Sequence, residues 1–286
     1  MKVKIALVQM SMTDSKKENV EKAAKMTLDA IKKGANIICM PEVFAAPYFP
    51  QYQKFDFTPY LETTNEVTEK FSKIAKENKT VIVLGSLFVK GKDANYNVTY
   101  VIDADGKTVG EYHKTHIPHD PNFYEQHYFA PGKHGFKVFA TRYGKIAPLI
   151  CYDQWFSEAA RAAALQGAEI IFYPTAIGTV HGVEQSEGNW QEAWEAVQRG
   201  HAVANSVAVC TVNRSGKEDE MQFWGGSFIY DQFGTLKAHA KNKDEIIIAE
   251  IDLELQKQVR QGWRFFKERR PEHYASLIDE KLVDKK

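Results

Sequence analysis

Lys145-Ile-Ala-Pro-Leu-Ile150 runs directly into Cys151-Tyr-Asp-Gln-Trp-Phe-Ser-Glu-Ala-Ala-Arg161. The apolar first segment predicts a β-strand, and the second predicts a helix that follows it closely. Cys151 therefore stands at a strand-to-helix corner, where the positive end of the helix would lower the pKa of a thiol and favour its nucleophilic form. Cys39 and Cys210 lie instead inside apolar runs, where a cysteine usually packs as a small buried residue.

The alternation of strand and helix extends outward from this corner along the whole chain. β-Branched and apolar runs predict strands, and apolar residues at helical spacing predict helices. The first half contains predicted strands at 3–10, 37–40, 80–86, 95–103 and 108–113 and predicted helices at about 15–34 and 67–75. The second half contains predicted strands at 145–150, 169–173, 206–212, 225–230 and 245–251 and predicted helices at about 156–166 and 188–204.

Two halves of similar pattern predict an α/β fold in which two sheets pack face to face and helices cover both outer faces, a four-layer α-β-β-α sandwich. Asp105-Gly106 between two strands predicts a hairpin, so we expect two mixed sheets. A single doubly wound sheet is the alternative that the pattern leaves open. Residues 1–262 are expected to form one domain, with the run 216–220 as a solvated loop. The charged tail 263–286 carries aromatic residues and is expected to dock on the domain or on a partner subunit.

Composition indicates an ordinary soluble protein and excludes several classes of function. The 286 residues include 37 Lys plus Arg and 37 Asp plus Glu, so no overall charge favours nucleic acid or an anionic membrane. Three cysteines without disulfide or zinc spacing favour reduced thiols in the cytoplasm. The N-terminal apolar run is too short for a signal sequence, and no run of about 18 apolar residues predicts a membrane span. Small molecules and further subunits are the expected partners.

Three reactive side chains, Glu42, Lys114 and Cys151, each follow a predicted strand. Ligands of open α/β sheets bind at the carboxyl ends of strands, so we expect the three groups to converge. Cys151 would attack a carbonyl carbon, and Glu42 would act as general base and acid. Lys114 and the backbone N–H of Tyr152 would stabilise the oxyanion. Taken singly, each also fits an ordinary role as a solvated loop charge or a buried core cysteine.

These residues lie in the motifs Ile38-Cys-Met-Pro-Glu42-Val-Phe, Tyr112-His-Lys114-Thr-His-Ile-Pro118 and Leu149-Ile-Cys151-Tyr-Asp-Gln-Trp155. In this combination and order they resemble the glutamate, lysine and cysteine motifs of the nitrilase superfamily of carbon–nitrogen hydrolases. The resemblance covers nearly the whole chain. It implies the α-β-β-α sandwich, a catalytic triad of Glu42, Lys114 and Cys151, no metal or organic cofactor, and at least a dimer. It further implies that Glu125 assists the lysine and the substrate, although by itself Glu125 also fits a surface loop acid.

Residues 151–161, 166–178 and 200–205 are similar to the N-carbamoylputrescine amidase branch of this superfamily. That likeness implies hydrolysis of N-carbamoylputrescine to putrescine, carbon dioxide and ammonia through a covalent intermediate on the cysteine. Another amidase of the superfamily, either β-ureidopropionase-like or an aliphatic or ω-amidase, is the alternative. The candidate contacts for such a cationic carbamoyl diamine are Tyr48, Asp120, Tyr124, Trp155, Thr175 and Glu187.

A diamine end requires acids or aromatic faces, and residues 180–198 contain four glutamates, Glu187 among them. The simpler interpretation of these glutamates is an acidic helix face in solvent. One position departs from the branch: His119 follows Pro118 where an acid is usual, and Asp120 comes one place later. A displaced acid would move or weaken the amine-binding end.

Two other classes of function remain as alternatives. His113, His116 and His119 recur at intervals of three and suggest ligands of a metal hydrolase. Pro118 argues against the helix that would align them, and alternate residues of a strand point to opposite faces, so no metal is expected. The second alternative is a non-catalytic binding protein on the same scaffold. Such a protein is expected to have lost a residue of the triad, whereas all three are present in this sequence.

Overall fold

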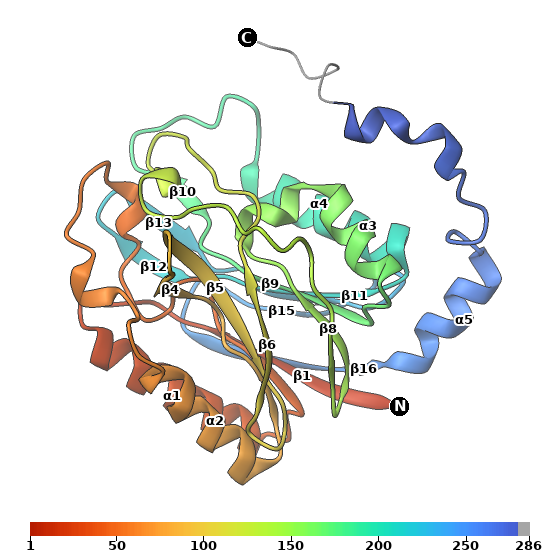
Figure 1. Ribbon diagram of the computed structural model, residues 1–286, viewed down its shortest axis with the longest axis horizontal. Helices are drawn as coiled ribbons and strands as arrows, with labels where there is room; N and C mark the ends of the chain where they lie inside the picture. The colour runs from red at the N-terminus through yellow and green to blue at the C-terminus, as the bar shows by residue number, and fades with distance from the viewer. Residues whose placement is uncertain (280–286) are drawn as a thin grey trace.

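Two large mixed sheets form the centre of the structure, a computed structural model that describes residues 1–279 (Figure 1). The seven-stranded sheet has the order β16-β1-β2-β3-β5-β4, with β6 also paired to β5. Its strands are β1 (Lys2–Gln9), β2 (Ile37–Cys39), β3 (Val81–Val83), β4 (Leu87–Lys90), β5 (Asn95–Ile102), β6 (Thr108–His113) and β16 (Glu245–Asp252). Because β1, β2 and β3 run parallel while β16 and β5 run antiparallel to their neighbours, the sheet is mixed, as predicted.

The second large sheet is six-stranded and has the order β15-β14-β11-β9-β8-β7. Its strands are β7 (Phe139–Thr141), β8 (Gly144–Pro148), β9 (Ile170–Pro174), β11 (Ala208–Val212), β14 (Phe228–Tyr230) and β15 (Leu236–His239). A three-stranded sheet lies beside it and consists of β10 (Gly178–Val180), β12 (Ser215–Glu218) and β13 (Met221–Trp224). The prediction of a solvated loop at 216–220 was therefore wrong for its first part, because residues 215–218 pair in register with β13.

Alternate residues of the strands belong to different layers. On β1, Ile5 and Leu7 join the apolar cluster between the two large sheets. Ala6 and Val8 point the other way and join the cluster beneath the helices of residues 16–32 and 66–78. Side chains of β9 alternate in the same way: one face of the strand packs towards the first sheet, and the other packs against the helices of residues 157–165 and 190–205. Each fully buried aliphatic side chain contributes about 1.5–3 kcal/mol, so both faces of these strands stabilise the fold. The α-β-β-α sandwich is thus confirmed, and the single doubly wound sheet is not.

Four helices form the outer layers (Figure 1): α1 (Lys16–Lys32), α2 (Glu66–Asn78), α3 (Ser157–Leu165) and α4 (Trp190–Asn205). Polar caps fix where two of them begin. Ser15 Oγ accepts the backbone N–H of Glu18 at 3.3 Å at the start of α1, and Asn189 Oδ1 accepts that of Glu192 at 3.0 Å at the start of α4. A short 3₁₀ helix, η4 (Cys151–Trp155), separates β8 from α3.

The end of the chain leaves the sandwich through α5 (Leu253–Trp263) and continues into the short helices η5 (Pro271–His273) and η6 (Ala275–Ile278). The Phe266 ring lies against the domain, with the guanidinium carbons of Arg161 and Arg260 5.3 and 4.5 Å from its centroid. Residues 280–286 of the predicted tail lie outside the described residues. None of the helices described between residues 1 and 279 is long and apolar enough to cross a membrane.

Candidate active site

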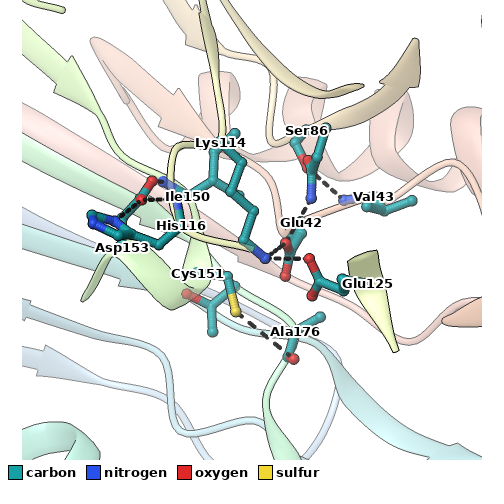
Figure 2. Close-up of polar contacts among 12 residues, drawn as sticks. Glu42, Val43, Ser86, Lys114, His116, Glu125, Ile150, Cys151, Asp153 and Ala176 are labelled. Atoms are coloured by element: carbon teal, nitrogen blue, oxygen red, sulfur yellow. Dashed lines mark hydrogen bonds and ion pairs between the residues drawn. The ribbon is translucent and has the colours of Figure 1, made fainter. Parts of the chain in front are cut away.

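Lys114 lies just beyond the end of β6, at the centre of a buried cluster of charges (Figure 2). Its Nζ donates to Glu42 Oε1 at 2.8 Å and to Glu125 Oε2 at 2.5 Å. All three side chains are at most 1% exposed. Asn97 Nδ2 donates to the same oxygen of Glu42 at 2.8 Å, while Glu42 Oε2 is buried without a hydrogen-bond partner among the described residues. This second oxygen is therefore free to exchange a proton with a thiol, an amine or a water.

Two groups of this cluster, Lys114 and Glu125, have raised pKa values. Burial lowers the pKa of Lys114, but the negative charges of Glu125 and Glu42 raise it further, so the pKa lies above its ordinary value and the ammonium persists. Burial raises the pKa of Glu125 to about 7, against the opposing effect of Lys114. Two carboxylates around one ammonium would leave a buried negative charge. A proton on Glu125 neutralises that charge, which is why burial among these groups raises the pKa of Glu125.

Cys151 forms a strained elbow beside this cluster, with a φ of 40° that few residues other than glycine adopt. The buried Asp153 carboxylate holds the elbow. Its Oδ2 accepts the backbone N–H of Ile150 at 3.0 Å and the Tyr112 hydroxyl at 2.7 Å. Its Oδ1 accepts the backbone N–H of His116 at 3.0 Å. One carboxylate therefore ties the elbow to the two ends of the segment that carries Lys114.

The expected lowering of the thiol pKa is contradicted. Cys151 is only 7% exposed, and burial together with the charge of Glu42 raises its pKa well above the ordinary value, against the opposing effect of Lys114. The helix predicted at about 156–166 is present as α3, which begins at Ser157, and the 3₁₀ helix η4 separates it from Cys151. The field of a helix end fades within one turn. The resting thiol is therefore protonated, and attack requires a base.

The Cys151 side chain lines a pocket of about 490 Å³, within the range of roughly 300–1,000 Å³ typical of small-molecule sites. Of the candidate substrate contacts, Asp120, Trp155 and Glu187 also line it, together with Glu125. The pocket lining is otherwise mostly apolar, with further aromatic rings from Phe123 and Trp190. The structure thus joins the acids expected to bind an amine with the candidate nucleophile.

Three other predicted contacts lie outside this lining. The Tyr48 hydroxyl donates to Glu125 Oε1 at 3.0 Å, so Tyr48 contacts the charged cluster and not the pocket. Tyr124 packs against His119 and His127, and its neighbour Phe123 takes the place in the pocket. Thr175 Oγ1 is buried and bonds to Gln154 Oε1 at 3.1 Å. His119, directly after Pro118, packs against other loop residues, whereas Asp120 lines the pocket. The acid that is displaced by one position therefore still belongs to the site.

The three histidines that suggested a metal site have separate partners. His113 Nε2 lies 3.1 Å from Glu111, His116 Nδ1 lies 2.7 Å from Asp153, and His119 packs against His127. Within residues 1–279, no three His, Cys, Asp or Glu side chains are grouped as ligands of a metal ion.

A family model described as carbon–nitrogen hydrolase matches residues 4–261. The chain belongs to the carbon–nitrogen hydrolase family. A carbon–nitrogen hydrolase from Helicobacter pylori G27 has a similar crystal structure, with a TM-score of 0.94 and 37% identity over 98% of this chain and 99% of that chain. The N-carbamoylputrescine amidase of Oryza sativa subsp. japonica is 44% identical over 97% of this chain and 95% of its own length. The citrullinase of Francisella tularensis subsp. tularensis is 38% identical over 96% and 98%.

Several residues that shape the site of this carbon–nitrogen hydrolase were missed in the sequence. Asn97 orients Glu42, and a polar residue inside an apolar strand was the available signal. Asp153 lies two residues after Cys151, and its place within the cysteine motif was the available signal. Trp190 Nε1 donates to Glu187 Oε2 at 3.2 Å, a contact with no signal in the sequence.

Proposed function

We propose that this hydrolase converts N-carbamoylputrescine and water to putrescine, carbon dioxide and ammonia. The observation that carries the proposal is the charge of the pocket. Asp120 and Glu187 line the cavity that holds Cys151, and no Lys or Arg is among its described lining residues. Hydrogen bonds from its own backbone N–H and from Trp190 lower the pKa of Glu187, so it is anionic at neutral pH. Carboxylates beside aromatic rings favour a cationic amine and disfavour a carboxylate.

The first half of the proposed reaction transfers the carbamoyl group to sulfur. Glu42 Oε2 takes the proton of the Cys151 thiol as sulfur attacks the carbonyl carbon. The Lys114 ammonium and the Tyr152 backbone N–H stabilise the oxyanion that develops. When this intermediate collapses, the carbon–nitrogen bond breaks, and Glu42 returns the proton to the departing amine.

Water completes the proposed cycle. Glu42 removes a proton from water as the oxygen attacks the thiocarbamate carbon, and Lys114 again faces the oxyanion. Cleavage of the carbon–sulfur bond restores the Cys151 thiol with the proton held by Glu42. Because putrescine was the departing amine, the released carbamate decomposes to carbon dioxide and ammonia. Glu42 thus serves alternately as base and acid, twice each in one cycle, which its single unpaired oxygen favours.

A substrate panel with released ammonia as the readout tests this proposal. It compares N-carbamoylputrescine with N-butylurea, which lacks the distal amine, with citrulline, which adds a carboxylate, and with N-carbamoyl-β-alanine. We expect N-carbamoylputrescine to have the highest kcat/KM, because only it presents a cation without a carboxylate. A preference for either carboxylate-bearing compound would overturn the choice of substrate.

Inhibition distinguishes the cysteine mechanism from the two other classes of function. Iodoacetamide is expected to abolish activity, whereas chelators such as EDTA leave it intact. Loss of activity on chelation with recovery on addition of metal would support a metal hydrolase instead. If no compound in a wide panel of amides, nitriles and carbamoyl compounds is hydrolysed, a binding protein is the better description.

We also propose that the enzyme acts in the cytoplasm as a homo-oligomer, a dimer or larger. Its cysteines, all buried, are free thiols. Trp263 is 57% exposed on the described chain, as expected for an aromatic residue that contacts another subunit. Light scattering coupled to gel filtration tests this proposal, and a monomer at micromolar concentration would refute the assembly.

A further inference from the structure

Arg214 follows β11, and its side chain is fully buried (0% exposed). Its guanidinium donates to three carbonyl oxygens within the backbone segment 42–46. Nη2 donates to the carbonyl oxygens of Val43 at 2.6 Å and Ala46 at 3.0 Å, and Nε donates to that of Glu42 at 3.2 Å. The planar fork of Arg214 therefore holds the segment that carries the proposed general base.

The third nitrogen of the same guanidinium, Nη1, is connected indirectly with Glu125, the second acid of the cluster. Nη1 of Arg214 contacts both carboxylate oxygens of Glu218, at 2.8 and 3.1 Å. Glu218 Oε2 accepts the backbone N–H of Tyr48 at 2.6 Å, and the Tyr48 hydroxyl donates to Glu125 Oε1 at 3.0 Å. Arg214 is thus connected with Glu125 through two sets of hydrogen bonds, joined by the covalent frame of Tyr48 between its backbone N–H and its hydroxyl.

The segment held by Arg214 has an unfavourable backbone conformation. Val43 has a φ of 45°, and a β-branched residue at positive φ is a strained outlier that needs outside support. That support comes from hydrogen bonds to both the N–H and the carbonyl oxygen of Val43. Ser86 Oγ accepts the N–H of Val43 at 2.9 Å, and Arg214 binds the carbonyl oxygen. The strained turn lies directly after Glu42 and so sets the direction of its side chain.

Stability alone is a weak explanation for this arrangement. A buried ion pair such as that between Arg214 and Glu218 often contributes little net stability, because desolvation offsets the attraction. The placement of catalytic groups is a stronger explanation, since a misplacement of about 1 Å in such a group costs about 100-fold in rate. The guanidinium makes these contacts in a fixed plane, which the single ammonium of a lysine cannot reproduce.

We propose that Arg214 is a positioning residue for both carboxylates of the active site. It fixes Glu42 through the backbone of 42–46, and it fixes Glu125 through Glu218 and Tyr48. The inference rests on the proposed roles of Glu42 and Glu125 in the reaction, and it assigns Arg214 no contact with substrate.

Arg214→Lys tests the inference, with the best substrate of the panel. Charge is kept but the fork is lost, so kcat is expected to fall about 100-fold. KM should change little, because Arg214 does not line the pocket. In Arg214→Ala, guanidinium ion at non-denaturing concentration should restore part of the lost kcat. Arg214→Lys with kcat close to wild type, in protein that is folded by circular dichroism, would overturn the inference.

Arg260→Lys is the matched control, because Arg260 Nη2 also donates to two backbone carbonyl oxygens, those of Ala168 and Asn205, at 3.5 and 3.3 Å. It should lower Tm without changing kcat. If Arg214→Lys does not fold, Glu218→Gln decides the question: it should lower kcat more than KM, and unchanged kcat would refute the relay to Glu125. If Cys151→Ala and Glu42→Gln retain activity, the proposed function fails. If only the Arg214 and Glu218 variants retain activity, the inference alone fails.

Discussion

Lys114 Nζ lies 2.8 Å from Oε1 of Glu42, and both side chains are fully buried. This contact commits one oxygen of the carboxylate to the ammonium and leaves the other unpaired among the described residues. The two oxygens therefore have different tasks. The paired oxygen fixes the orientation of the carboxylate, and the unpaired oxygen is the one available for proton transfer.

Glu42→Gln separates these two tasks. The amide oxygen still accepts from Lys114 and Asn97, but the group no longer takes a proton. We expect kcat to fall by about 10²–10⁴-fold, since general base catalysis contributes that much. Glu62→Gln is the matched control: Glu62 is also buried and pairs with Lys16 at 2.9 Å, away from the site. Steady-state ammonia release measures both, and an active Glu42→Gln enzyme would exclude Glu42 as the base.

Cys151→Ala is expected to abolish turnover, by about 10⁴-fold or more, because no nucleophile remains for the covalent step. Its circular dichroism and Tm should stay close to those of the wild type. Cys210→Ala provides the comparison, as a fully buried thiol between the sheets. It should retain kcat and lose about 1 kcal/mol of stability through a small cavity. Full activity in Cys151→Ala would exclude the mechanism.

The convergence of Glu42, Lys114 and Cys151 could be predicted because each of them follows a strand that is visible in the sequence. Glu42 and Cys151 follow apolar runs, Lys114 follows the second strand of a predicted hairpin, and ligand sites of α/β sheets form where strands end. Glu125 was different. Its position in a loop has no periodic pattern, and only the family resemblance indicated it.

The remaining features depend on contacts between distant parts of the chain. Glu218 lies in a charged run that favours solvent, yet it is buried against Arg214. Arg214 in turn binds the backbone at residue 42, which is 172 positions away in the sequence. The direction of the Cys151 pKa shift depends on burial and on the neighbouring acids, and neither is visible at a strand-to-helix corner. Phe123 lines the pocket instead of the predicted Tyr124, and the sequence could not distinguish these neighbours because a loop gives no alternation to follow.

Glu125 should make stability depend on pH. Burial raises its pKa from 4.5 to about 7, so the native state binds this proton more tightly than the unfolded chain. Its stabilising contribution is therefore complete below pH 4.5 and is lost as the pH rises through about 7. Relative to Glu125→Gln, the wild type should lose up to about 3 kcal/mol between about pH 5 and about pH 8. Urea unfolding across this range measures the difference, and a wild type that gains stability over Glu125→Gln as the pH rises would show the opposite sign.

Glu187→Gln and Asp120→Asn test the charge of the pocket. Each removes one carboxylate from the lining, so KM for N-carbamoylputrescine should rise about tenfold, the equivalent of about 1.4 kcal/mol. KM for N-butylurea should not change, because that compound carries no distal cation. Glu184→Gln is the control, since Glu184 is exposed on the same loop and lies outside the lining. Equal effects on both substrates would mean that these acids shape the pocket without binding the amine, and the specificity would then have to come from its aromatic walls.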